Sequence, residues 1–158
     1  MPSPAERLAT AWKRLSPLPG GHIVLGLLLR FAVPYSASVR PRILHLEPGH
    51  ATVVIRDRRH LRNHLRSVHA LALANVAELA SGLAMTLALP PGVRGIPVRI
   101  ETDYLKKARG PIRAEGHASP PATVADDTDT EAEAHAELYD EAGEVVCRTV
   151  VRWRLRPE

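Results

Sequence analysis

The sequence predicts an α+β domain in which a curved antiparallel sheet wraps around one long central helix. Two features carry this prediction. Residues 70–89 form an apolar, alanine-rich run that is too long for a strand and ends at a proline pair. A hairpin rich in β-branched residues precedes this run, and several strand-like segments follow it. At 158 residues with 45% hydrophobic residues, the chain has the size of one domain with a substantial core.

The N-terminal part is expected to be helical. Apolar residues recur at helical spacing between charged residues over 3–15, and prolines and glycines at 17–21 end the pattern. Residues 22–31 are apolar and fit either a second short helix or a buried strand. We therefore expect an N-terminal helical segment at 1–34 ahead of the main domain at 35–158.

Alternation of apolar and polar residues predicts the strands. A Pro48-Gly49 turn joins the first two strands, and a polar loop at 120–130 separates the middle strands from the last hairpin. The predicted strand segments are 42–46, 51–56, 98–104, 112–118, 131–138 and 147–156. In the last hairpin, a four-residue turn at 141–144 places acids against arginines across the strands, as Glu137–Arg148, Glu133–Arg152 and Glu131–Arg154.

The charge distribution allows an anionic partner without requiring one. Residues 1–69 hold 11 Lys and Arg against 3 Asp and Glu, whereas residues 70–158 hold 10 against 14. Nucleic acid and phosphorylated molecules such as coenzyme A are both candidates. The aromatic residues are not gathered on a basic segment, and the predicted hairpin pairs explain many of the arginines. We therefore expect no nucleic-acid partner.

Composition also bears on the compartment. A single cysteine, Cys147, excludes an intrachain disulfide framework and a cysteine-rich zinc site, which favours a reducing compartment, the cytoplasm. The N-terminus lacks the continuous apolar core of a signal peptide. Residues 70–89 carry Glu78 at their middle, where a bilayer would penalise it, so we expect a buried helix and no membrane span.

Glu78 is the candidate for chemistry because it is the only charged residue in its helix. A buried carboxylate must be paired, hydrogen-bonded or shifted toward its neutral form, and a poised carboxylate suits a general base or nucleophile. Asn75, Glu78 and Gly82 share one helical face, where the glycine leaves space beside the acid. A structural pairing of Glu78 and simple helix packing at Gly82 remain open interpretations.

The N-terminus of this helix is a second candidate. Free backbone N–H groups after His69 can polarise a carbonyl group, and Ser67 is expected to be the N-cap. His69 and Asn63 can act in catalysis or simply order the loop through hydrogen bonds.

The run from Asn63 through His69 to Glu78 and Gly82 resembles the hotdog-fold acyl-CoA thioesterases, in particular the PaaI-like group. The resemblance covers about residues 35–156 and implies a hotdog fold. It implies that Glu78 activates water or attacks the thioester, that Asn63 and His69 orient water and substrate, and that the Ala70 amide polarises the thioester oxygen.

The resemblance also implies partners. The site would form between two subunits of a homodimer, which can pair into a tetramer, with the Asn63–His69 loop of one facing Glu78 of the other. Ser67, Lys106, Lys107 and Arg109 would lie at the substrate, the three cations near the coenzyme A phosphates. No metal and no cofactor other than the coenzyme A part of the substrate is expected.

The chain departs from the family pattern at the loop. Arg66 stands near a position where the family has glycine, and Ala70 and Leu71 replace glycine after the histidine. These departures favour one alternative, a non-catalytic acyl-binding or assembly protein on the same fold. A second alternative is an acyl-thioester dehydratase, which also pairs histidine with an acid.

Overall fold

The computed structural model describes residues 4–124 and 130–157. Part of the loop predicted at 120–130 falls outside these residues. The helices are α1 (Pro4–Leu15), α2 (Gly21–Ala32) and α3 (Ala70–Ala88), with 3-10 turns η1 (Ser36–Val39) and η2 (Arg59–Leu61). The strands are β1 (Arg42–Glu47), β2 (His50–Ile55), β3 (Val93–Tyr104), β4 (Ile112–Ala118), β5 (Thr130–Tyr139) and β6 (Val145–Pro157).

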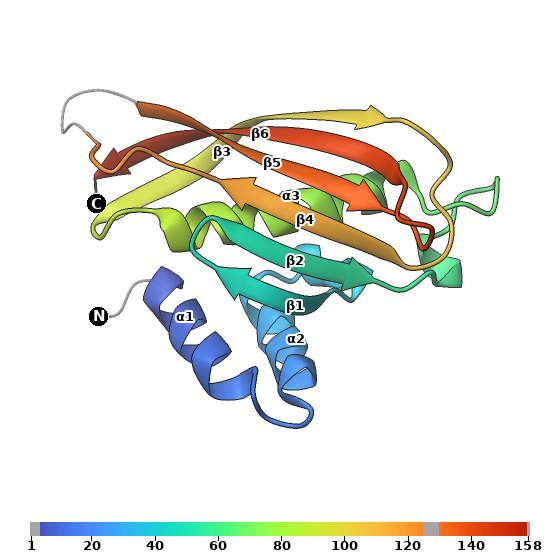
Figure 1. Cartoon of the computed structure of the whole chain (residues 1–158), viewed down its shortest axis with the longest axis horizontal. Coiled ribbons are helices and arrows are strands. Elements are labelled where there is room, and N and C mark those ends of the chain that lie inside the picture. The colour runs from blue at the N-terminus through green and yellow to red at the C-terminus, as the bar shows by residue number, and fades with distance from the viewer. Residues whose placement is uncertain (1–3, 125–129, 158) are drawn as a thin grey trace.

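The strands form one antiparallel sheet in the order β1-β2-β4-β5-β6-β3. The sheet curves around α3, while α1 and α2 lie beside its β1 edge (Figure 1). This arrangement is the hotdog fold and confirms the predicted fold class. The core lies between α3 and the inner face of the sheet, where alternate strand residues such as Val53, Ala114 and Leu138 are fully buried.

Small residues let α3 lie directly on β4. A Cβ added at Gly116 would overlap the backbone carbonyl of Ala80, so the strand has no room for a side chain where the helix crosses it. Among the described helices, α3 alone is long and apolar enough to cross a membrane by length and composition. Its apolar window is 61% buried by the rest of the chain, as in a core helix.

The ambiguous segment after Gly21 is a helix. Leu25 and Leu29 of α2 face the core, and His22 Nδ1 donates a 2.7 Å hydrogen bond to the carbonyl of Ile43 in β1. This bond and the packing of α2 cover the β1 edge of the sheet, which leaves fewer strand groups open to other chains.

The register of the last hairpin is confirmed. Glu137 lies opposite Arg148, Glu133 opposite Arg152 and Glu131 opposite Arg154. Arg148 Nε donates a 2.8 Å bond to Glu137. Arg152 lies 3.6 Å from Glu133 and 3.8 Å from Glu131, so one arginine serves two acids.

The opposite edge of the sheet, β3, is open. Among the described strands it pairs only with β6, and a bulge between Pro97 and Arg99 interrupts that pairing. Ile96, Val98 and Ile100 are 58%, 41% and 49% exposed. An edge strand with several exposed apolar residues is typical of a surface that another chain covers.

Candidate active site

Glu78 lies on the stripe of α3 that the sheet covers least. Its neighbours on this stripe are Leu71, which is exposed, Asn75, which is half-buried, and Gly82, which is buried. Within residues 4–124 and 130–157, no hydrogen bond or ion pair reaches the Glu78 carboxylate. Burial raises the pKa of this carboxyl group above its usual range. A buried acid held without a cation is a basic carboxylate when ionised, as a general base requires.

The surroundings of Glu78 offer space and unused polar atoms. A Cβ placed on Gly82 would lie 3.5 Å from Glu78 Oε1 and 3.6 Å from Cζ2 of Trp153 in β6, so the glycine separates acid and indole. Trp153 Nε1 and Asn75 Oδ1 are buried and have no hydrogen-bond partner among the described residues. Since buried polar atoms are normally paired, these atoms fit a place that a ligand completes.

The loop before α3 is built on Asn63. Its Oδ1 accepts hydrogen bonds from the backbone N–H of Leu65 at 2.9 Å, from that of Ser67 at 3.2 Å and from the Ser67 hydroxyl at 3.1 Å. The side-chain oxygen is therefore fully engaged in ordering the loop. Only the Nδ2 amide group of Asn63 remains for a substrate or water.

The prediction that Ser67 caps α3 is wrong. The N-cap is His69, whose ring Nδ1 accepts from the backbone N–H of Leu71 at 3.1 Å. Ser67 is buried and donates its hydroxyl hydrogen to Asn63. Because Nδ1 accepts, the neutral His69 ring carries its proton on Nε2, which is a hydrogen-bond donor.

The first turn of α3 leaves one amide open. The backbone N–H groups of Ala72 and Leu73 bond to the carbonyl of His69, whereas that of Ala70 has no acceptor among the described residues. The Tyr104 hydroxyl donates to the carbonyl of Ala70 at 3.0 Å. Tyr104, from β3, thus holds the start of the helix, a contact that sequence spacing could not reveal.

One chain does not bring the two halves of the predicted site together. Glu78 follows His69 by nine residues. At about 1.5 Å per residue, they are separated by about 13 Å along the helix axis. A residue that shares a reacting group with Glu78 must lie much closer, within hydrogen-bond reach of one substrate atom.

The cations after β3 divide into two groups. Lys106 Nζ lies 2.8 Å from Asp140 and also pairs with Glu144, so it braces the β5–β6 turn. Lys107 and Arg109 are exposed on either side of Ala108. The carbonyl of Ala108 accepts a 2.8 Å bond from the backbone N–H of Val68, which brings Lys107 and Arg109 beside the Asn63 loop.

Arg66 has the backbone conformation expected of a glycine. Its φ is 57°, in the left-handed region. The turn in the loop is therefore formed with an arginine where the thioesterase pattern has glycine. The strained backbone is held by the hydrogen bond from the Arg66 N–H to the carbonyl of Asn63 at 3.0 Å.

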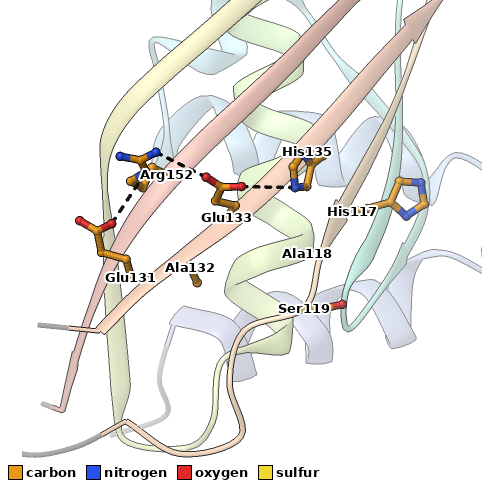
Figure 2. Close-up of a pocket in the computed structure, with 8 residues that line it drawn as sticks. All are labelled: His117, Ala118, Ser119, Glu131, Ala132, Glu133, His135 and Arg152. Atoms are coloured by element: carbon orange, nitrogen blue, oxygen red, sulfur yellow. Dashed lines mark ion pairs between the residues drawn. The ribbon is translucent and has the colours of Figure 1, made fainter.

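A hollow on the other side of the sheet does not belong to this site. Its lining comes from β4, β5 and β6 and includes Glu131, Glu133, His135 and Arg152 (Figure 2). These side chains pair with one another along the outer face, and α3 with Glu78 lies behind the sheet. The hollow is a charged sheet surface, whereas the candidate site lies on the helix side.

The chain matches the model of a domain of unknown function, DUF4442, over residues 21–155. The chain belongs to this family. No curated protein matches it. The family description assigns no activity.

Solved structures of thioesterase-family hotdog proteins, PaaI among them, share the fold of this chain, which confirms the structural resemblance to PaaI-like proteins. A structural-genomics crystal structure is 26% identical, with a TM-score of 0.82 over 96% of this chain and 99% of its own. A Pseudomonas aeruginosa protein of unknown function, described as a probable thioesterase, is 25% identical, with a TM-score of 0.70 over 89% and 97%. A mutant of the phenylacetic acid degradation protein PaaI from Thermus thermophilus is 20% identical, with a TM-score of 0.63 over 77% and 97%.

Proposed function

We propose that this hotdog protein hydrolyses an acyl-CoA or a related thioester. The observation that most supports this proposal is the state of the Glu78 carboxylate. It is partly buried, it has no partner among the described residues, and burial raises its pKa. Beside it, the absence of a side chain at Gly82 leaves the space of one methyl group between the acid and the indole of Trp153. The resemblance to the PaaI-like group, which has an acid with this role in its central helix, supports the proposal.

The proposed chemistry uses groups that the structure leaves available. Ionised Glu78 takes a proton from a water molecule whose oxygen attacks the thioester carbon, or it attacks that carbon itself to form an anhydride that water then hydrolyses. In both routes the carbon–sulfur bond breaks, the leaving thiolate takes up a proton, and the acyl group is released as a carboxylic acid. The free N–H of Ala70, at the positive end of α3, stabilises the oxyanion. The Nε2–H of His69 and the amide of Asn63 orient the water or the substrate. Glu78 of one copy would supply the base, and residues 63–70 of a second copy would supply the oxyanion donor and the orienting donors.

The proposed active form is a homodimer paired through β3. The exposed apolar residues of this open edge support it, because edge-to-edge pairing would extend the sheet and cover them. The separation of Glu78 from His69 within one chain supports it as well, since the Asn63 loop of a second copy can complete the site. A reducing cytoplasmic location fits the single free, buried Cys147.

The dimer is tested by substitution of one residue in the proposed interface. Ile100→Lys is expected to give monomers in analytical ultracentrifugation and to abolish hydrolysis, because a lysine would be buried in an apolar seam. Leu44→Lys on β1 is the matched control, since Leu44 is 42% exposed and Ile100 is 49% exposed. A dimer that survives Ile100→Lys unchanged would exclude the β3 interface.

Hydrolysis is tested with acyl-CoA substrates of increasing chain length, following thiol release. Glu78→Gln keeps the shape of the side chain and removes the base, so kcat should fall by about 100-fold or more. If wild type and Glu78→Gln are equally inactive but both bind acyl-CoA, the protein is an acyl-binding module. That outcome would rule out the proposed hydrolase activity.

A further inference from the structure

A second cluster of chemically competent side chains lies on the outer face of the sheet, remote from Glu78. His45 and Glu47 stand on β1, and His50 stands directly opposite Glu47 on β2. A bulge between Ile43 and His45 switches the alternation of β1, so that His45 points outward with Glu47. Bulges often re-aim a side chain in this way near functional sites.

The distances within the cluster are those of ligands and not of hydrogen bonds. His45 Nε2 lies 3.5 Å from Glu47 Oε2, and His50 Nδ1 lies 3.7 Å from Glu47 Oε1. Candidate ligand atoms of all three residues lie within 4.8 Å of one another. Two ligands bound to a tetrahedral zinc ion at about 2.0–2.1 Å lie about 3.3 Å apart. Small side-chain rotations therefore suffice to close the three groups on one ion.

A supporting set of contacts fixes His50 in the tautomer that a metal requires. Its Nε2 lies 2.9 Å from Glu115 Oε2, and the Thr52 hydroxyl donates to the same oxygen at 2.6 Å. With Nε2 donating to the carboxylate, the lone pair of Nδ1 points toward Glu47. A carboxylate behind a histidine is the usual second layer of a metal site, where it orients the ring and raises its basicity.

The ring of His50 is also held from the side. It stacks in parallel on His117 of β4, with centroids 4.6 Å apart, and the His45 ring lies with its centroid 5.0 Å from that of His50. Three strands thus contribute to a pre-arranged group that the proposed thioesterase chemistry does not use. Glu47 is 56% exposed, so an ion can enter from solvent.

We propose that His45, Glu47 and His50 bind one divalent transition-metal ion of the zinc class, with water in the remaining position. Two imidazoles and one carboxylate favour zinc over magnesium, which prefers an all-oxygen shell. The site lies at the hairpin end of β1 and β2, where the ion would link the two strands and stiffen the edge of the sheet.

The test is zinc binding by the untagged full chain after metal removal, measured by competition with a chromophoric chelator. One zinc ion per chain is expected, with no competition from magnesium. His45→Ala and His50→Ala should each weaken binding at least tenfold, and Glu115→Gln by about 10-fold to 100-fold. Circular dichroism of each variant checks that the sheet is intact.

His135→Ala is the control, because His135 is an exposed histidine on the same face outside the cluster. Wild type that takes up no stoichiometric zinc would overturn the proposal, and so would a loss in His135→Ala equal to that in His45→Ala. Thioester hydrolysis by His45→Ala should match wild type. The two proposals can therefore fail separately.

Discussion

Gly82 separates Glu78 from Trp153: a Cβ at this glycine would stand 3.5 Å from the Glu78 carboxylate oxygen and 3.6 Å from the indole. These are ordinary contact distances, so an alanine fits without displacing either neighbour. A glycine inside a helix is nevertheless unfavourable compared with alanine. The sequence therefore keeps a destabilising residue where a stabilising one would fit.

Gly82→Ala is expected to raise stability and to lower activity. The free energy of unfolding should increase by about 0.5–1 kcal/mol, because alanine is the better helix former. The added methyl group fills the space between the acid and the indole of Trp153, so KM should rise or kcat should fall. Urea unfolding and the acyl-CoA assay measure the two effects. Unchanged kinetics would mean that Gly82 serves packing alone.

Glu78 should make stability depend on pH in a defined direction. Burial raises its pKa in the folded state, so the folded chain holds this proton more tightly than the unfolded chain. Its stabilising contribution is complete below the unfolded pKa and is lost as pH rises through the folded pKa. As pH rises through this window, the free energy of unfolding of wild type, measured in urea, should fall relative to that of Glu78→Gln. A constant difference between the two proteins across about pH 4–7 would contradict the burial argument.

Arg66→Gly should stabilise the chain. Relief of a left-handed arginine is worth about 1–2 kcal/mol, and the extra freedom of unfolded glycine costs about 0.5–1 kcal/mol. The expected net gain is about 0.5–1 kcal/mol in urea unfolding. Arg66→Ala is the control, because alanine keeps the strained Cβ and should gain nothing. If Arg66→Gly and Arg66→Ala change the free energy of unfolding equally, the change comes from loss of the arginine charge.

Lys107 and Arg109 should act on the phosphates of coenzyme A. Changing both to alanine is expected to raise KM for acyl-CoA by about tenfold or more, with little change in kcat, as for lost charge-assisted contacts. Acyl-pantetheine substrates, which lack those phosphates, should be unaffected. Lys106→Ala should lower stability and leave KM unchanged, since Lys106 pairs with Asp140. Equal KM changes for both substrates would exclude phosphate recognition.

Mixing two inactive variants should restore hydrolysis if each site takes residues from both subunits. Glu78→Gln and His69→Ala are each expected to be inactive. In a statistical mixture of dimers, half are mixed and carry one intact site, so about one quarter of wild-type activity should return. Native mass spectrometry of the same mixture, with one variant carrying a mass tag, checks that the subunits exchange. No recovery despite exchange would show that Glu78 and His69 of different subunits do not form a shared site.

The hairpin of β5 and β6 was predictable because its information is local. Opposite charges alternate on one face of both strands, so the pairing of Glu137 with Arg148 follows from one turn length. The N-cap of α3 was not predictable in the same way. Ser67 has the preferred side chain, but Asn63 draws its hydroxyl into the loop, and His69 takes the position. The preference of serine for the N-cap position is overridden here because the Asn63 side chain accepts the hydrogen bond of the Ser67 hydroxyl.

The outer-face histidines were missed for a different reason. His50 meets Glu115 and His117 because β2 pairs with β4 while β3 crosses to the far edge of the sheet. Nothing in the spacing of His45 and Glu47 reveals the bulge that aligns them. By contrast, Glu78 could be identified because a single acid in an apolar helix stands out without knowledge of any contact.

The length of α3 between its capping histidine and its acid has a consequence for regulation. If each centre is completed only when two chains meet, specific activity should fall on dilution as the dimer dissociates, and recover on concentration or under crowding. The concentration of the protein would then control its specific activity without any modification or effector.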